Sequence, residues 1–254
     1  MGFEEFKQEV IKGLKDHFGR TCKVDCMEAL KNNGVIKEGV QILKNGSDVR
    51  LAPVVYFDEL YDQYGGDVKR SIDGVIRIAE QSQEYGELRE FADDLSSWDM
   101  VKDRVYPALL NTDENMELLH TLVHEPFLDL SIVFLIRGSA VNGGFLCVKV
   151  THKLLKSWGI RKKELRDRAF RNMRNEGCSF MDMEEILFKA FSWKMDREKE
   201  DDPAAGKMMV LSNRENYYGA IYMADADTLA EKLGSFNCYI LPASIHEGAT
   251  RFAA

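Results

Sequence analysis

The chain has 254 residues, of which 45% are hydrophobic and 10% aromatic, so it can bury a core in one large domain or two smaller ones. Its 42 acidic and 34 basic residues give a net charge of -8. This balance argues against nucleic acid as a partner, because non-specific binding depends on fields of Lys and Arg that release counterions. No segment approaches the run of about 18 apolar residues that a membrane span needs, so we expect no membrane association.

The cysteines and the first residues indicate the compartment. The five cysteines are an odd number spread along the whole chain, which is typical of free thiols and not of a disulfide framework. The first ten residues, MGFEEFKQEV, contain acids and no apolar signal core. We therefore expect a cytoplasmic protein.

The first part of the chain predicts two helices and three strands. Apolar residues three or four positions apart predict a helix that begins at Phe3 and ends near Gly19. Short apolar runs separated by the turn sequences NNG, KEG and KNGSD predict strands near 22–30, 35–43 and 49–56. Helical spacing returns from Val68 to about Glu84. The polar stretch 82–99 then predicts a boundary, with regions 1–95 and 96–254 as two α+β domains or as one continuous domain.

The second part begins with a strand at 101–111 and a helix at 113–124. Residues 127–136 are almost all apolar, which predicts a central strand covered on both sides. Asn142 and the two glycines after it predict a hairpin to a strand at 145–150.

Beyond residue 150 the pattern is mainly helical. Helices are expected at 152–158, 162–175 and 182–192, the last with a capping box formed by Asp182 and Glu185. A polar loop at 194–207 precedes an antiparallel pair of strands at 208–211 and 218–223, a helix at 225–233 and a last strand at 238–241. Hairpin-connected strands favour an α+β fold with a mixed, largely antiparallel sheet and flanking helices.

The motifs of the large enzyme classes are absent from the sequence. His120 and His124, four residues apart, would share one helix face and could hold a metal ion, but no third ligand is nearby, and an ordinary pair of helix-end histidines is the alternative. Cys22 and Cys26 would lie about 13 Å apart in a strand, too far for one ion. Residues 153–174 are rich in Lys and Arg, as a solvated helix face often is. We expect no metal and no cofactor.

The segment after the last predicted strand carries the most reactive combination of side chains. Ser244, His246 and Glu247 provide a hydroxyl, an imidazole and a carboxylate within four residues. These groups serve in nucleophilic or general-base catalysis when the geometry brings them together. A structural role, in which the tail returns from the strand and the histidine bonds within the fold, is the alternative.

Several blocks of the sequence, taken together, resemble an uncharacterised bacterial family known as domain of unknown function 5688, found mainly in gut Firmicutes. The blocks are KNNGV at 31–35, VVYFDELYDQY at 54–64, VKDRV at 101–105, LLNTDENMELLHTLVHEPFLDLSIVF at 109–134, WGI at 158–160, VLSN at 210–213, GAIYM at 219–223 and YILPASIHE at 239–247. They cover most of the chain. The resemblance indicates a family but does not indicate any particular biochemical activity.

The resemblance singles out five positions as a shared site or a shared structural need. His124, Asn213, Ser244, His246 and Glu247 match the family pattern. The chain departs from it at Ala243, where members commonly have a second Ser. It also departs at Val123-His124-Glu125, where they have Pro-His-Arg.

These observations favour a non-enzymatic binding or regulatory module that acts through a protein partner. Polar side chains fit the family pattern, but no complete catalytic set exists. His124 and Asn213 are then candidate binding residues. The alternative is a hydrolase-like enzyme in which His246 and Glu247 activate Ser244 or a water molecule.

Overall fold

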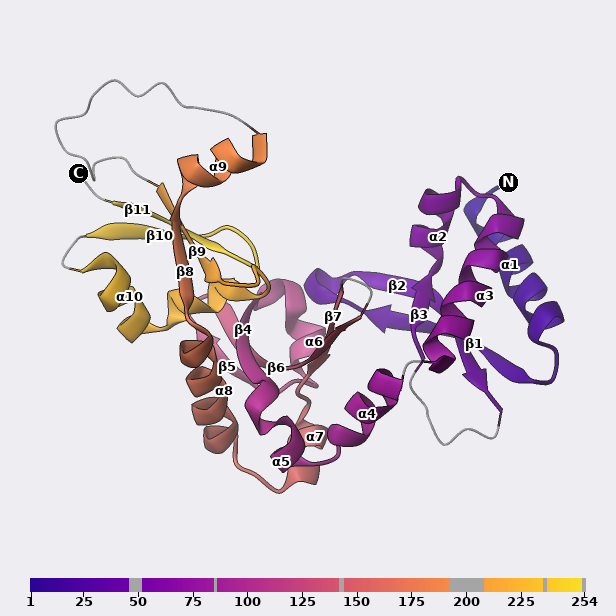
Figure 1. Cartoon of the computed structure of the whole chain (residues 1–254), viewed down its shortest axis with the longest axis horizontal. Helices are drawn as coiled ribbons and strands as arrows, with labels where there is room; N and C mark the ends of the chain where they lie inside the picture. Colours follow the sequence, from indigo (N-terminus) through magenta and orange to yellow (C-terminus); the bar gives the residue numbers. More distant parts are fainter. Residues whose placement is uncertain (46–51, 85, 142–143, 192–207, 235–236, 253–254) are drawn as a thin grey trace. The chain divides into compact units, whose positions relative to one another are not determined.

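The computed structural model describes residues 1–45, 52–84, 86–141, 144–191, 208–234 and 237–252 (Figure 1). The chain divides into two compact units, Met1–Ser97 and Trp98–Ala254. Strands of the described residues pair only with antiparallel neighbours, and they form three sheets flanked by helices. The α+β prediction is confirmed, although the strands form separate sheets and not one. None of the described helices is long and apolar enough to span a bilayer.

The first unit packs helices on a small sheet. Its elements are α1 (Phe3–Phe18), β1 (Cys22–Leu30), the 3-10 turn η1 (Asn32–Gly34), β2 (Ile36–Lys44), β3 (Val54–Tyr56), α2 (Phe57–Tyr64), α3 (Val68–Glu84) and α4 (Gly86–Asp94). The sheet has the order β1-β2-β3, and α1 packs against α3 and β1. Phe6, Val10 and Leu14 of α1 are fully buried there, as the apolar spacing predicts.

The expected helices at 3–18 and 68–84 and the first two strands are therefore confirmed. Positions 49–51 of the third expected strand lie outside the described residues. Two helices are not predicted by the sequence pattern: α2, in an aromatic-rich stretch, and α4, in the polar stretch of the expected boundary.

The second unit begins with a sheet centred on β6. The elements are α5 (Trp98–Val101), η2 (Lys102–Arg104), β4 (Val105–Asn111), η3 (Asp113–Asn115), α6 (Met116–Leu119), β5 (His124–Phe127), β6 (Leu130–Val141) and β7 (Gly144–Lys149). β6 pairs with β4, β5 and β7. Ile132 and Phe134 are buried in it, so the central strand and its hairpin to β7 are confirmed, while turn residues 142–143 lie outside the described part.

Three expectations in this region differ from the structure. The strand expected at 101–111 begins only at Val105, because Val101 ends α5 and Lys102–Arg104 form η2. The apolar run 127–136 is not one strand: Phe127 ends β5, and the chain reverses at Leu128, which has φ 56° and an 89% exposed side chain. The helix expected over 113–124 is also broken, because α6 ends at Leu119 and His124 begins β5. The error at Leu128 follows from an apolar residue at a positive-φ turn position that Gly or Asn normally fills. The helix is broken by a turn at His120 and Thr121, although the apolar spacing continues to Val123.

The rest of the second unit adds helices and another sheet. The elements are α7 (His152–Trp158), α8 (Lys162–Glu176), β8 (Cys178–Asp182), α9 (Met183–Phe191), β9 (Met208–Asn213), the 3-10 helix η4 (Gly219–Ala224), α10 (Ala226–Leu233), β10 (Cys238–Pro242) and β11 (Gly248–Phe252). The sheet has the order β10-β11-β9-β8.

The helices expected at 152–158, 162–175, 182–192 and 225–233 are confirmed, with ends that differ by at most a residue where the chain is described. Asp182 accepts a hydrogen bond from the Glu184 amide (2.9 Å), whereas Glu185 pairs with Lys189. The strand expected at 218–223 is wrong, because these residues form η4 and β9 pairs with β8 and β11. β8 and β11 were missed, and the expected loop at 194–207 lies outside the described residues.

Candidate functional site

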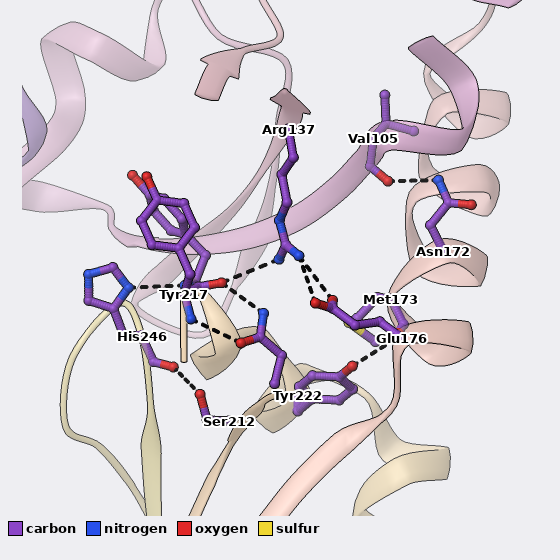
Figure 2. A network of polar contacts seen from close by, with 11 residues as sticks. Val105, Arg137, Asn172, Met173, Glu176, Ser212, Tyr217, Tyr222 and His246 are labelled. Carbon is purple, nitrogen blue, oxygen red and sulfur yellow. Dashed lines mark hydrogen bonds and ion pairs between the residues drawn. The ribbon is translucent and has the colours of Figure 1, made fainter. Parts of the chain in front are cut away.

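A network of polar contacts joins the sheet of β6 to the C-terminal elements (Figure 2). The Arg137 Nη1 atom donates to both carboxylate oxygens of Glu176 (2.9 and 3.0 Å), and Nη2 donates to the carbonyl of Tyr217 (3.3 Å). The guanidinium lies 3.9 Å from the ring centroid of Tyr106. Both charged side chains are only 14% exposed, so a mostly desolvated ion pair ties β6 to the end of α8.

Each partner of this ion pair stands where sequence rules disfavour it. Glu176 is the last residue of α8, where the helix dipole repels a carboxylate. Arg137 directly follows the buried run Ile132–Ile136 within the same strand. The pairing gives each of these charges a partner of opposite sign. Neither residue is among the sequence-predicted site residues, although a charge inside an apolar strand is a signal that could have identified Arg137.

Asn213 closes the loop that follows β9. Its side chain is buried, its Nδ2 donates to the Tyr217 carbonyl (2.8 Å), and its Oδ1 accepts from the Tyr217 amide (2.9 Å). The Tyr217 carbonyl therefore accepts hydrogen bonds from both Asn213 and Arg137. The predicted binding residue fixes the path of the backbone between β9 and η4.

His246 connects this loop to the β10–β11 hairpin. Its Nδ1 accepts a hydrogen bond from the Tyr218 amide (3.0 Å), and its carbonyl accepts from Ser212 Oγ (2.7 Å). The ring stacks on Tyr217, with centroids 5.4 Å apart. Because Nδ1 is an acceptor, the neutral ring carries its proton on Nε2. A Cβ atom at Gly219 would lie 2.8 Å from the His246 carbonyl and 2.3 Å from Ser212 Oγ, so this approach requires glycine.

Ser244 and Glu247 form the hairpin turn itself. The Ser244 hydroxyl accepts from the amides of His246 (3.0 Å) and Glu247 (3.2 Å), and the Ser244 amide donates to the Glu247 carbonyl (3.0 Å). Both side chains are exposed. Among the described residues, no hydrogen bond joins the Ser244 hydroxyl or the Glu247 carboxylate to the His246 ring. The three groups are adjacent, but they are not arranged as a catalytic triad.

The two remaining histidine candidates lie apart from this network. His124 Nδ1 is 3.0 Å from the Leu122 carbonyl, and the His124 carbonyl accepts from Lys162 Nζ (2.5 Å). The expected shared helix face of His120 and His124 is wrong, because the helix ends before either residue. Within the part of the chain that the structure describes, no three His, Cys, Asp or Glu residues are grouped as a metal site would require.

The nucleophilic groups near Arg137 are held in their protonated forms. Cys147, which pairs with Arg137 across β6 and β7, has its pKa raised to about 11 by burial. Burial raises the pKa of Tyr217 to about 12, and it also raises the pKa of Tyr106. A thiol and phenols of this kind are neutral at pH 7. The network can therefore hold the backbone in place and donate hydrogen bonds. The buried thiol and phenols are poorly suited to act as bases or nucleophiles.

The second unit is thus an α+β scaffold whose polar residues join loops around a desolvated Arg–Glu pair. A family model described as a family of unknown function, DUF5688, matches residues 3–248. The chain belongs to this family. No curated protein and no solved structure matches the chain.

Proposed function

We propose that the protein is a non-enzymatic binding or regulatory module that acts through a protein partner, and that the partner adds a strand to β10. The observation that carries the proposal is the composition of this edge strand. β10 stands at one end of its sheet, and Tyr239, Ile240 and Leu241 are 68%, 37% and 47% exposed.

Edge strands of soluble proteins are normally protected by charges, proline or a covering element, since their unpaired backbone groups attract other strands. The sequence of β10, Cys-Tyr-Ile-Leu-Pro, has no charge and only a terminal proline. Its partner β11 is held in place by the hairpin turn and by His246. A braced, uncharged edge suits the addition of an extended segment, with backbone hydrogen bonds for affinity and apolar side chains for specificity.

The hydrolase alternative receives no comparable support. The Ser244 hydroxyl accepts hydrogen bonds from two backbone amides, and the Nδ1 atom of His246 accepts one from a third. A nucleophile and its base must lie within about 2.6–3.2 Å of each other or be bridged by a water molecule. The candidate residues serve the turn and the loop, which favours the binding module.

A peptide-display experiment tests the proposed function. A random library is selected on the wild-type protein, and selected peptides are measured against Ile240→Lys and against Ile36→Lys, a control at an exposed position of β2. We expect peptides with alternating apolar residues that slow amide exchange in β10. Their affinity should fall at least about tenfold, or about 1.4 kcal/mol, in Ile240→Lys only. Equal binding to both variants, or no peptide that protects β10, would contradict the proposal.

We also infer that the protein is a bacterial cytoplasmic one. The bacterial origin is supported by the resemblance of its sequence blocks, and the compartment by five cysteines that are all free. Protein isolated from its source cells and alkylated without reductant should carry five modified thiols. Disulfide-linked peptides would contradict the cytoplasmic location.

A further inference from the structure

A groove of about 600 Å³ runs along α8 in the second unit. Five of its lining side chains are basic: Lys102, Arg161, Lys163, Arg168 and Arg171. The groove is held open by fixed contacts, since Arg168 Nε and Asn172 Nδ2 both donate to the Lys102 carbonyl (3.1 and 2.8 Å) and so join α8 to η2. It shares no residue with β10 or with the Arg137 network.

Three of these cations already have ion-pair partners. Lys102 pairs with Asp99 (2.7 Å), Lys163 pairs with Asp167 (2.5 Å), and Arg168 pairs with Asp103. Neither Arg161 nor Arg171 forms a salt bridge with any residue that the structure describes, and both are exposed. The Asp167 carboxylate interacts with Arg171 but already pairs with Lys163, so the groove keeps an excess of positive charge at Arg161 and Arg171 in a chain whose net charge is -8.

The positions of the arginines define the length of a ligand. Glu164, Arg168 and Arg171 lie along one face of α8 at steps of three or four, and Arg161 is the N-cap residue just before the helix. The helix rises about 1.5 Å per residue, so the backbone positions of Arg161 and Arg171 are about 15 Å apart. A ligand that meets each arginine at its own position along the helix is elongated and carries several negative charges.

The beginning of α8 adds to the positive field. Lys162 and Lys163 occupy the first turn with Glu164, and the Arg161 side chain makes no capping hydrogen bond. Cations at this end of a helix oppose its dipole, and an anionic ligand bound there would offset that repulsion.

An apolar wall stands at the same end of the groove. The half-buried Trp98 indole donates from Nε1 to Glu164 (3.1 Å), and its ring lies 5.5 Å from that of Trp158. Tryptophan rings are large, rigid contact surfaces that often anchor protein interfaces. A ligand that follows the arginines can therefore place an apolar side chain against Trp98.

The lining favours a protein segment over a nucleic acid. Asp99, Glu164 and Asp167 alternate with the cations, so the groove presents mixed charge. A continuous row of phosphates would meet these carboxylates, whereas a peptide can match the arginines with acids and leave the aspartates next to neutral or basic side chains. We propose that the groove along α8 binds an acidic segment of a protein partner, with acids facing Arg161 and Arg171 and an apolar side chain on Trp98.

Fluorescence anisotropy with defined probes tests this proposal. The probes are a designed helical peptide of about 15 residues with one aromatic residue and Glu side chains spaced to face both arginines, the same peptide with Gln for Glu, and a single-stranded oligonucleotide of similar length. Each is titrated with the wild-type protein, with Arg161→Glu/Arg171→Glu, and with Lys153→Glu/Lys156→Glu. The last variant changes charge equally on exposed positions of α7, outside the groove.

We expect the Glu peptide to bind at least about tenfold more tightly than the Gln peptide, and to weaken with salt. The arginine variant should lose this preference and the lysine variant should keep it. Tighter binding of the oligonucleotide, equal losses in both variants, or no binding of the Glu peptide would overturn the proposal. Ile240→Lys should leave Glu-peptide binding unchanged, so this result is independent of the β10 experiment.

Discussion

His246 contacts three segments at once, the Tyr217–Tyr218 loop, Ser212 of β9 and the hairpin turn. His246→Ala removes the acceptor of the Tyr218 amide and the stacking contact with Tyr217. We expect the free energy of unfolding to fall by about 1–3 kcal/mol, the usual cost of leaving a shielded polar group without its partner. Urea denaturation of the variant measures this change.

Glu247→Ala is the matched control, because the Glu247 side chain is exposed and only its backbone takes part in the turn. It should change stability by less than about 0.5 kcal/mol. Both variants should also be assayed beside the wild type for esterase, phosphatase and nuclease turnover. An unchanged melting temperature with turnover lost in His246→Ala would favour the hydrolase alternative over the binding module.

Asp225 should make stability depend on pH. It is 2% exposed and accepts hydrogen bonds from Arg174 and from Thr228 Oγ1 (2.6 Å). Burial alone would raise the pKa of Asp225, but the hydrogen bonds and the charge of Arg174 outweigh it and lower that pKa. A carboxyl whose pKa is lowered by folding stabilises the protein above its ordinary pKa of about 3.9, and this stabilisation disappears as the pH falls through the lowered value.

Asp225→Asn should therefore reduce the free energy of unfolding at pH 7 by more than it does near the pH at which Asp225 becomes protonated. Urea denaturation at a series of pH values measures the difference between variant and wild type. A difference that stays constant down to the acid limit of folding would show that the carboxylate charge contributes nothing.

The thiols should differ in reactivity according to burial. Burial raises the pKa of Cys147 and of Cys178 to about 11, whereas Cys26 is exposed on β1 and its pKa is raised less. Since the thiolate is the reactive form, iodoacetamide at pH 8 should modify Cys26 before Cys147 or Cys178. Peptide mass spectrometry against time gives the order. Fast labelling of Cys147 in the folded protein would contradict the burial of this thiol and its raised pKa.

At the scale of residues, the sequence predicts some members of the polar network but not the contacts that they make. Asn213 and His246 stand out in the sequence as polar residues that match a family pattern. Their partners are the backbone groups of Tyr217 and Tyr218, and a backbone partner leaves no mark on residue type. Arg137 and Glu176 are 39 residues apart in the chain, so their pairing depends on the packing of α8 beside β4.

Among the elements, β6 should contribute most to stability. Phe134 is fully buried in it and pairs with Pro107 of β4. Phe134→Ala should lower the free energy of unfolding by about 3–5 kcal/mol through lost burial and the cavity that remains. Leu128→Ala, at an exposed position of the neighbouring turn, is the control and should change it little. A denaturation curve of Phe134→Ala that overlays the wild-type curve would contradict the central position of β6.

Elements whose apolar residues recur at a regular spacing were predictable from the sequence. Elements whose conformation depends on tertiary packing were not. α1, α3, α7 and α8 follow their sequence patterns because each helix buries one stripe or is bounded by caps. The β5–β6 turn consists of Leu128 and Asp129, and Leu128 takes the positive φ that Gly or Asn usually adopts, so the mostly apolar sequence around Asp129 gave no clear sign of a turn. Residues 218–223 resemble a strand, but packing over Gly248 and against β9 holds them as η4, where Met223 fills the space that a side chain at position 248 would occupy.

For the whole molecule, the two units have separate cores. The cluster around Phe6, Val10, Leu14, Val40 and Leu60 contains residues of Met1–Ser97 only. The cluster around Ala108, Leu110, Val133 and Leu135 contains residues of Trp98–Ala254 only. A domain folds alone when its elements bury their apolar faces on one another, and both units meet this requirement within their own sequence.

We therefore expect fragments 1–97 and 98–254 to fold independently when each is expressed alone. Each should show the circular dichroism of its own helices, dispersed amide resonances and a cooperative melting transition. A division between Ile136 and Arg137 is the control, because it cuts β6 and separates β4 from β7, and its fragments should lack such transitions. If fragment 1–97 or 98–254 is unfolded under conditions in which the full chain is folded, the stability of that unit depends on the other, and the division at Ser97 does not separate two domains.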